Sequence, residues 1–300
     1  MCCLFGIVDY QNNLTPRQLN RITAVLSRAC EARGTDATGI AYNWNDNLKI
    51  YKQPVPTHKM KYQIPFGVHT IIGHTRMTTQ GDEKQNYNNH PFYGSASNTD
   101  FALAHNGVLH NDIILRATKE LPDTTIETDS YIAVQLIEKK ETLDTDSLKY
   151  MAEQLEGSFT ITVLDQKDNL YFVKGDNPMC IYHFKSKGIY IYASTEEILL
   201  KALKKMPYRF GAYEKIDVAS GEILKIDKHG KTSKTYFDDS NLIDYSYYPR
   251  TFRFARTDED DYLDTLKSVA TTYGISENYI DCLLEEGFTT DDIEELIYCY

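Results

Sequence analysis

A run of short β-prone segments in the second half of the chain constrains the fold most. Five such segments between residues 158 and 227 alternate apolar and polar residues and are separated by turn residues: SFTITVLD, NLYFVKG, MCIYHF, GIYIYAS and GEILKID. This alternation predicts antiparallel strands stacked in two sheets. The first half adds β-prone segments at 4–10, 69–76 and 101–109, and a hairpin of 39–44 with 47–53. Within 101–109 we expect a tight turn at Asn106-Gly107.

Helical segments interrupt these strands near the N-terminus and in the middle of the chain. Thr15 is expected to cap a helix with Pro16 in its first turn, followed by apolar residues at helical spacing as far as Ala29. Thr128 and Asp129 are expected to cap a second helix that runs to Lys140, and residues 148–155 form a third. Many antiparallel strands covered by a few helices predict an α+β fold.

The composition of the chain changes after about residue 236. We expect residues 2–236 to form the main domain and residues 237–256, which are polar and aromatic without periodicity, to form a linker or strap. Residues 257–300 contain three short amphipathic segments, the second capped by Ser276, and predict a small three-helix module. We expect this module to serve for docking to a protein partner.

Composition also limits the classes of function. The net charge is −11 and there is no lysine- or arginine-rich run, so nucleic acid and anionic membranes are not expected as partners. No apolar run approaches the roughly 18 residues of a membrane helix, and the N-terminus lacks the features of a secretory signal, so we expect a cytoplasmic protein. The six cysteines show no metal-binding spacing, so no metal is expected.

Cys2 is the first residue that suggests chemistry. Removal of Met1 would leave Cys2 with both a thiol and a free α-amine. An α-amine has a pKa of about 8, so it can accept the thiol proton and later donate a proton to a leaving amine. On its own, however, Cys2 is better explained as a small residue that merely follows the initiator methionine.

Eight sequence blocks, in order, resemble the class II (N-terminal nucleophile) glutamine amidotransferases across roughly residues 2–225. The blocks are MCCLFGI, RGTDATG, GHTRMTTQG, NNHPF, ALAHNGVLHN, TDS, and LEGSFTITVLD followed by YASTEE. The resemblance implies a four-layer αββα sandwich with Cys2 at the end of a central strand. It implies no cofactor.

The resemblance also assigns roles to individual residues. Cys2 would be the nucleophile that attacks the side-chain amide of glutamine. The side-chain NH₂ of Asn106 and the backbone N–H of Gly107 would stabilise the oxyanion. An ordinary hairpin turn is the alternative interpretation of this Asn-Gly pair.

Three further residues would bind the substrate by the same resemblance. Arg76 suits the α-carboxylate of glutamine because its guanidinium is planar and bidentate, and Asp129 suits the α-ammonium. Thr79, in the same loop as Arg76, would add substrate contacts. The alternatives are a surface salt bridge for Arg76 and a helix N-terminal charge for Asp129. We expect His74 and His105 to be structural residues beside the site.

The chain departs from the family pattern at four positions: Cys3 stands for glycine, Thr35 for proline, Met77 for tryptophan and Gln80 for histidine. Because no acceptor-domain motif follows residue 236, we expect a stand-alone glutaminase that passes ammonia to a separate acceptor protein or to water. Two alternatives remain: a catalytically silent glutamine-binding regulatory subunit, and another amidohydrolase with an N-terminal cysteine.

Overall fold

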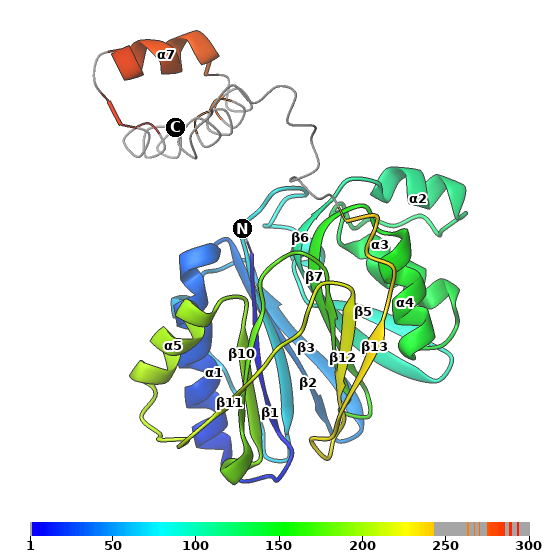
Figure 1. Ribbon diagram of the computed structural model, residues 1–300, viewed down its shortest axis with the longest axis vertical. Helices are drawn as coiled ribbons and strands as arrows, with labels where there is room; N and C mark the ends of the chain where they lie inside the picture. Colours follow the sequence, from blue (N-terminus) through cyan, green and yellow to red (C-terminus); the bar gives the residue numbers. More distant parts are fainter. Residues whose placement is uncertain are drawn as a thin grey trace. The chain divides into compact units, whose positions relative to one another are not determined.

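The computed structural model describes residues 2–242 and 275–285, together with residues 263, 267, 270, 288, 289 and 293. The chain divides into two compact units, Met1–Ile243 and Asp244–Tyr300. The described part of the first unit contains two antiparallel β-sheets packed face to face with helices on their outer faces (Figure 1).

The first sheet has seven strands in the order β11-β9-β10-β1-β4-β2-β3. Their bounds are β1 Cys3–Asp9, β2 Ala37–Trp44, β3 Asn47–Gln53, β4 Thr70–Arg76, β9 Cys180–Phe184, β10 Ile189–Ala193 and β11 Glu214–Ile216. Strand β1 lies in the middle, paired with β10 on one side and β4 on the other. Every residue of β1 is buried, as expected for a strand that is covered on both faces.

The second sheet has six strands in the order β13-β12-β8-β7-β6-β5. Their bounds are β5 Phe92–Ala96, β6 Thr99–Leu109, β7 Gly157–Asp165, β8 Leu170–Lys174, β12 Glu222–Ile226 and β13 Thr232–Tyr236. The longest of these, β6, pairs with β7 from Phe101 to Leu109.

Helices cover the outer face of each sheet. Helices α1 (Pro16–Cys30) and α5 (Glu196–Lys205) pack on the first sheet, and α3 (Tyr131–Lys139) and α4 (Thr145–Gln154) pack on the second. Helix α2 (Asp112–Thr118) follows β6. Within residues 2–242, the connections contain the single 3₁₀ turns η1 (Glu31–Arg33), η2 (Thr57–Lys59), η3 (Asn86–Asn88) and η4 (Lys185–Lys187).

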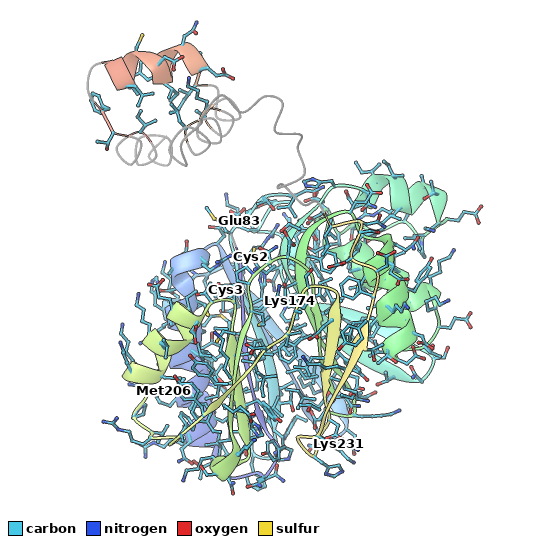
Figure 2. The ribbon with its side chains drawn as sticks, viewed as in Figure 1. Cys2, Cys3, Glu83, Lys174, Met206 and Lys231 are labelled. Atoms are coloured by element: carbon cyan, nitrogen blue, oxygen red, sulfur yellow. The ribbon has the colours of Figure 1, made fainter. Side chains whose placement is uncertain are left out.

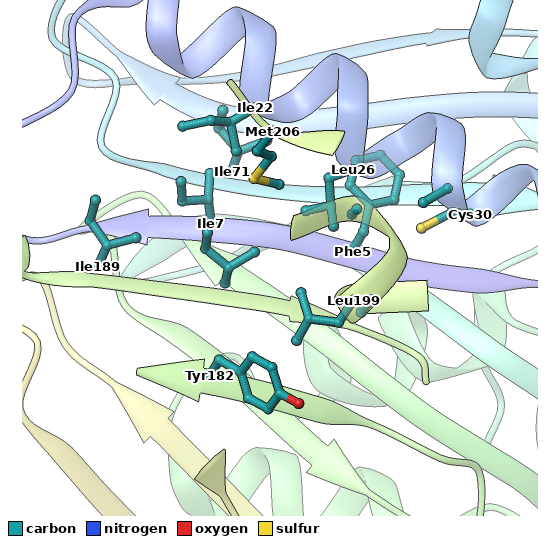
Figure 3. Packing of buried hydrophobic residues seen from close by; sticks show 14 of the residues in the cluster. Phe5, Ile7, Ile22, Leu26, Cys30, Ile71, Tyr182, Ile189, Leu199 and Met206 are labelled. Carbon is teal, nitrogen blue, oxygen red and sulfur yellow. The ribbon is translucent and has the colours of Figure 1, made fainter. Parts of the chain in front are cut away.

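Three apolar layers hold these four layers of backbone together. In the layer between the first sheet and its helices, Phe5 and Ile7 of β1 face Leu26 of α1 and Leu199 of α5 (Figure 3). The next side chains along β1 point the other way, into a layer between the two sheets, and a third layer joins the second sheet to α3 and α4. Full burial of each such side chain is worth about 1.5–3 kcal/mol. The predicted four-layer αββα sandwich is therefore confirmed.

Several local predictions are also confirmed. Thr15 caps α1: its hydroxyl accepts from Gln18 N at 3.3 Å, and the Gln18 side chain accepts from Thr15 N at 2.9 Å. The hairpin of β2 and β3 turns at Asn45 and Asp46, which have φ values of 49° and 58°. Two consecutive positive φ angles are typical of a type I′ turn, whose twist matches the flanking strands.

The predicted turn at Asn106-Gly107 is wrong. Strand β6 runs without interruption from Thr99 to Leu109, with Asn106 opposite Thr160 and Gly107 opposite Phe159. Strand β7 offers pairing partners along this whole stretch, so the chain continues instead of turning. Gly107 permits this with a φ of 147°, an extended conformation that other residues rarely adopt.

The predicted start of the middle helix also needs correction, since α3 begins at Tyr131 and no side chain caps it. The Asp129 carboxylate accepts from Ser130 and from Leu109 of β6 instead. Helix α5 was not expected from the sequence, although its apolar residues follow helical spacing behind the N-cap Thr195.

In the second unit, α7 (Glu277–Glu285) forms where the Ser276-capped segment was predicted, and the Ser276 hydroxyl accepts from Tyr279 N at 3.4 Å. Ile280 of α7 is buried in an apolar cluster with Ala270 and Ile293. The other two predicted helices lie mostly outside the described residues, as does the 237–256 segment beyond Leu242. The boundaries 2–236, 237–256 and 257–300 stay predictions. Among the described residues, no helix has the length and apolarity needed to cross a bilayer.

Candidate active site

The candidate residues come from four segments that meet at one end of the sandwich. The register of β1 with β4 sets Cys3 opposite Thr75, so Cys2 lies beside the end of β4, where Arg76 stands. Figure 2 shows Cys2 and Cys3 toward the same end of this unit as Glu83, with Met206 and Lys231 toward the other end. Across the sandwich, His74 Nε2 of β4 contacts the backbone oxygen of His105 in β6 at 2.9 Å.

The Cys2 thiol is partly exposed and is held by backbone groups. The N–H of Met77 donates to Sγ at 3.4 Å, Sγ lies 3.5 Å from the Met77 oxygen, and Arg33 Nε donates to the Cys2 carbonyl at 3.0 Å. Burial raises the pKa of the Cys2 thiol, while the Met77 backbone and the Arg76 charge act in the opposite direction. A thiol with a raised pKa is protonated near neutral pH, so it needs a base before it can attack.

The neighbouring Cys3 does not crowd Cys2. Its side chain is completely buried and belongs to the apolar layer under α1, together with Cys30. Alternation along a strand sends consecutive side chains to opposite faces, so a larger residue than the family's glycine fits here without entering the site.

Arg76 is buried, with 3 % of its surface exposed, and it already makes internal hydrogen bonds. One terminal nitrogen donates to Asn89 Oδ1 at 2.7 Å, and the other donates to the carbonyls of Gln80 at 2.5 Å and Gly81 at 3.0 Å. A guanidinium has five N–H donors. At least two of these, on Nε and Nη1, have no partner in the described part of the chain and remain for a ligand.

The polar side chain of Asn106 is buried and unsatisfied, as are both ring nitrogens of His90 among the described residues. Asn106 is 1 % exposed, and neither its nitrogen nor its oxygen has a hydrogen-bond partner among the described residues. Gly107 follows it at a point where the two strands approach closely: an added Cβ would lie 1.8 Å from the carbonyl oxygen of Ser158. A side chain would clash with β7 there, so this position requires glycine.

Asp129 lies between the end of β6 and the start of α3, and it is 4 % exposed. Its Oδ2 accepts from Leu109 N at 2.6 Å, and its Oδ1 accepts from Ser130 N at 2.8 Å and Ser130 Oγ at 3.1 Å. Its own N–H donates to the side-chain oxygen of Gln80 at 3.2 Å. Carboxylate oxygens have about four acceptor sites, so capacity remains for a cationic ligand.

Three buried histidines lie beneath these groups. The His90 ring lies 4.2 Å from that of His74 and 6.4 Å from that of His105. Burial lowers the pKa of all three, that of His74 to about 3, so the cluster is uncharged at neutral pH. This agrees with a structural role. No group of three or more His, Cys, Asp or Glu side chains within the described ranges is arranged to hold a metal ion.

Thr79 is the predicted site residue that the structure connects least with the others. It is exposed and makes no hydrogen bond among the contacts of the described chain. Its neighbour Thr78 is closer to the chemistry: its N–H donates to Asp36 Oδ2 at 2.6 Å, and its buried hydroxyl has no partner in the described part of the chain.

Sequence reasoning assigned no site role to three residues that hold this site together. Gln80 contacts both Arg76 and Asp129. Lys52 donates to the Asn89 carbonyl at 2.5 Å, and burial, aided by the Arg76 charge, lowers its pKa to about 8. Ser130 bonds to Asp129 and to His105. Ser130 and Gln80 gave a signal in the sequence, Ser130 as the last residue of the TDS block and Gln80 as a departure within the GHTRMTTQG block, whereas Lys52 gave none.

Residues 1–176 of the chain match the family model described as glutamine amidotransferases class-II. The glutamine–fructose-6-phosphate aminotransferase (isomerizing) of Listeria innocua is 32 % identical over 214 residues, covering 68 % of this chain and 33 % of that protein. The Bacillus licheniformis enzyme of the same name is 33 % identical over 186 residues, covering 59 % and 30 %. The chain thus spans about a third of the length of the curated relatives it matches.

Two solved structures share the fold. The glutamine phosphoribosylpyrophosphate amidotransferase from B. subtilis, complexed with ADP and GMP, superimposes with a TM-score of 0.62 over 90 % of this chain and 58 % of that chain, at 19 % identity. A structure described as the allosteric regulatory enzyme of purine biosynthesis gives a TM-score of 0.59 over 79 % and 49 %, at 20 % identity.

Proposed function

Because the chain belongs to the class II glutamine amidotransferases, we propose that Cys2 hydrolyses the side-chain amide of glutamine as an N-terminal nucleophile. The observation that most supports this proposal is the Asn106 side chain, which is buried beside Gly107 without a partner among the described residues. An unsatisfied buried polar group costs about 1–3 kcal/mol and needs an explanation. An oxyanion that forms only during the reaction would supply the missing partner.

The proposed reaction begins once Met1 has been removed. The α-amine of Cys2 takes the thiol proton, and the thiolate forms a bond to the amide carbon of glutamine. The Asn106 NH₂ and the Gly107 N–H donate to the oxyanion, and removing one such donor costs about 10²–10³ in rate. Collapse of this intermediate breaks the C–N bond, and the α-ammonium donates its proton to the leaving ammonia. Water, with the α-amine again as base, then hydrolyses the glutamyl thioester to glutamate.

The two charged ends of glutamine fit the two charged residues of the site. Arg76 would pair with the α-carboxylate through its remaining N–H groups, and Asp129 would accept from the α-ammonium. Gln80 contacts both residues, so closure of its loop over the substrate would adjust both anchors together. Thr79 would join the contacts only when this loop closes, since it is exposed in the free protein.

The four departures from the family pattern are compatible with this chemistry. Met77 contacts Cys2 through its backbone N–H, which any residue can supply, and Cys3 points into the apolar layer. Gln80 replaces histidine but makes two hydrogen bonds within the site. Thr35 immediately precedes Asp36, whose carboxylate holds the loop at Thr78.

We further propose that the ammonia passes to an acceptor on a separate partner protein or is released to water. Names of the curated relatives identify fructose 6-phosphate as their acceptor, but this chain spans only about a third of their length. The C-terminal unit, with α7, is our candidate for docking such a partner.

The test is a stoichiometric assay on the full chain and on Cys2→Ser. Glutamate and ammonia should form in equal amounts from glutamine with the natural chain, and the variant should form neither. If the natural chain also forms neither while glutamine still raises its melting temperature, the silent glutamine-binding alternative is correct. Faster hydrolysis of a penicillin or bile-acid amide than of glutamine would instead support another N-terminal-cysteine amidohydrolase.

A further inference from the structure

The Ser130 hydroxyl lies between a carboxylate and an imidazole in the interior of the site. Ser130 Oγ is 3.1 Å from Asp129 Oδ1 and 2.7 Å from His105 Nδ1. All three residues are at most 4 % exposed, so water does not compete for these contacts. Hydrogen bonds in such surroundings are strong and fix the groups that they join.

The direction of the protons follows from the chemistry of the three groups. A carboxylate can only accept, and a hydrogen bond to an ionised acceptor is stronger than one to a neutral acceptor. The single hydroxyl proton of Ser130 therefore points to Asp129. Its oxygen can then accept from His105 in the tautomer that carries its proton on Nδ1.

These bonds hold β6 on both sides of the oxyanion donors. Through Ser130, the Asp129 carboxylate is joined to His105, the residue before Asn106. Through its other oxygen, the same carboxylate accepts from Leu109 N at 2.6 Å, two residues after Gly107. One carboxylate thus fixes residues 106 and 107 from either side, and Ser130 supplies one of the two connections.

We propose that Ser130 is a positioning residue that aligns Asp129 with the oxyanion donors and so makes the site selective for substrates with an α-ammonium group. This inference rests on the proposed function, in which Asp129 binds that ammonium. Without the hydroxyl, Oδ1 keeps only the Ser130 N–H as a donor and His105 loses its acceptor, so the carboxylate is held less firmly in the orientation that meets the ammonium. The effect should therefore be larger for glutamine than for an amide that lacks the α-amine.

The experiment compares glutamine with glutaramate, the same amide without the α-amino group, in the natural full-length chain, Ser130→Ala and Ser130→Thr. We expect Ser130→Ala to lower the ratio of kcat/KM for glutamine to that for glutaramate by roughly tenfold or more, mostly through the glutamine KM, as expected for loss of a hydrogen bond to a charged group. Ser130→Thr, which keeps the hydroxyl, should restore the ratio. An unchanged ratio in Ser130→Ala overturns the proposal.

Two controls separate the possible failures. Ser147→Ala removes another buried serine hydroxyl, in the capping box of α4, and should lower the melting temperature without changing the ratio. Asp129→Asn tests the underlying assignment: if it leaves the ratio unchanged, Asp129 does not bind the ammonium and the proposed role of Asp129 fails. If Asp129→Asn lowers the ratio and Ser130→Ala does not, only the role of Ser130 is wrong.

Discussion

Replacing Asn106 by alanine should leave the protein at least as stable as before while it lowers glutamine hydrolysis by two to three orders of magnitude. The side chain is 1 % exposed, and its two polar atoms bond to none of the described residues. Removing them therefore breaks no hydrogen bond and relieves a desolvation cost of about 1–3 kcal/mol. The small cavity that remains offsets part of this gain. We expect a change in the free energy of unfolding between zero and about 2 kcal/mol in favour of the variant.

The effect on catalysis has the opposite sign. In the transition state the Asn106 NH₂ would donate to the oxyanion, and the loss of such a donor costs about 2.7–4 kcal/mol, or 10²–10³ in kcat. Glutamine binding should change little, because the ground-state carbonyl oxygen does not yet occupy the oxyanion position. Steady-state formation of glutamate and urea unfolding measure the two effects on the same protein samples.

A matched control is available in Asn43, another buried asparagine. Its side chain donates to the Asp165 carbonyl at 2.7 Å and to Asp168 Oδ1 at 2.8 Å, at the end of β2 away from Arg76. Asn43→Ala should cost about 1–3 kcal/mol of stability with kcat unchanged. If Asn106→Ala instead loses stability like this control and keeps its kcat, Asn106 is a structural residue and the reasoning is refuted.

Three further predictions concern the rest of the site. The free energy of unfolding should fall as the pH drops below about 6.5, because His74 has a pKa of about 3 in the folded protein but binds a proton once the chain unfolds. Below pH 6.5 this difference in proton binding lowers the free energy of unfolding by roughly 1.4 kcal/mol per pH unit. Equal free energies of unfolding at pH 7.5 and 5.5 would contradict this. Gly107→Ala should destabilise the protein by about 3 kcal/mol or more and remove activity. The new Cβ would lie 1.8 Å from the Ser158 carbonyl oxygen, and the φ of 147° disfavours any side chain. A variant with the melting temperature of the natural protein would disprove this close approach of Gly107 to Ser158. Arg76→Lys should raise the KM for glutamine about tenfold or more with a smaller change in kcat, since an ammonium cannot span the partners of the guanidinium; an unchanged KM means that Arg76 does not bind the substrate.

Local rules of sequence reading worked where the chain itself supplies the partners. The cap of α1 needs only Thr15 and Gln18, and the hairpin turn needs only two residues that tolerate positive φ. Asn106-Gly107 has the same turn chemistry, yet it lies within a strand, because β7 provides pairing partners more than fifty residues later in the chain. Tertiary pairing overrode a strong local preference there.

The candidate site divides in the same way. Motifs proposed Cys2, Arg76 and Asp129 as candidates because each falls in a recognisable block of sequence. The contacts between blocks were not predictable. The Gln80 side chain accepts from Asp129 N, 49 residues later in the sequence, and the Ser130 hydroxyl contacts His105 Nδ1 in β6, 25 residues earlier. Such contacts depend on how the sheets and helices pack, which no single segment of sequence encodes.

The central claim is that Cys2 is an N-terminal nucleophile for glutamine, and an intact-mass spectrum tests it most directly. The purified full chain is measured before and after treatment with 6-diazo-5-oxo-norleucine, a glutamine analogue that alkylates such cysteines, and the adduct is mapped by peptide sequencing. We predict loss of Met1 and one adduct on Cys2, prevented by excess glutamine. A chain that retains Met1 and gains no adduct, or gains it on another cysteine, would contradict the account.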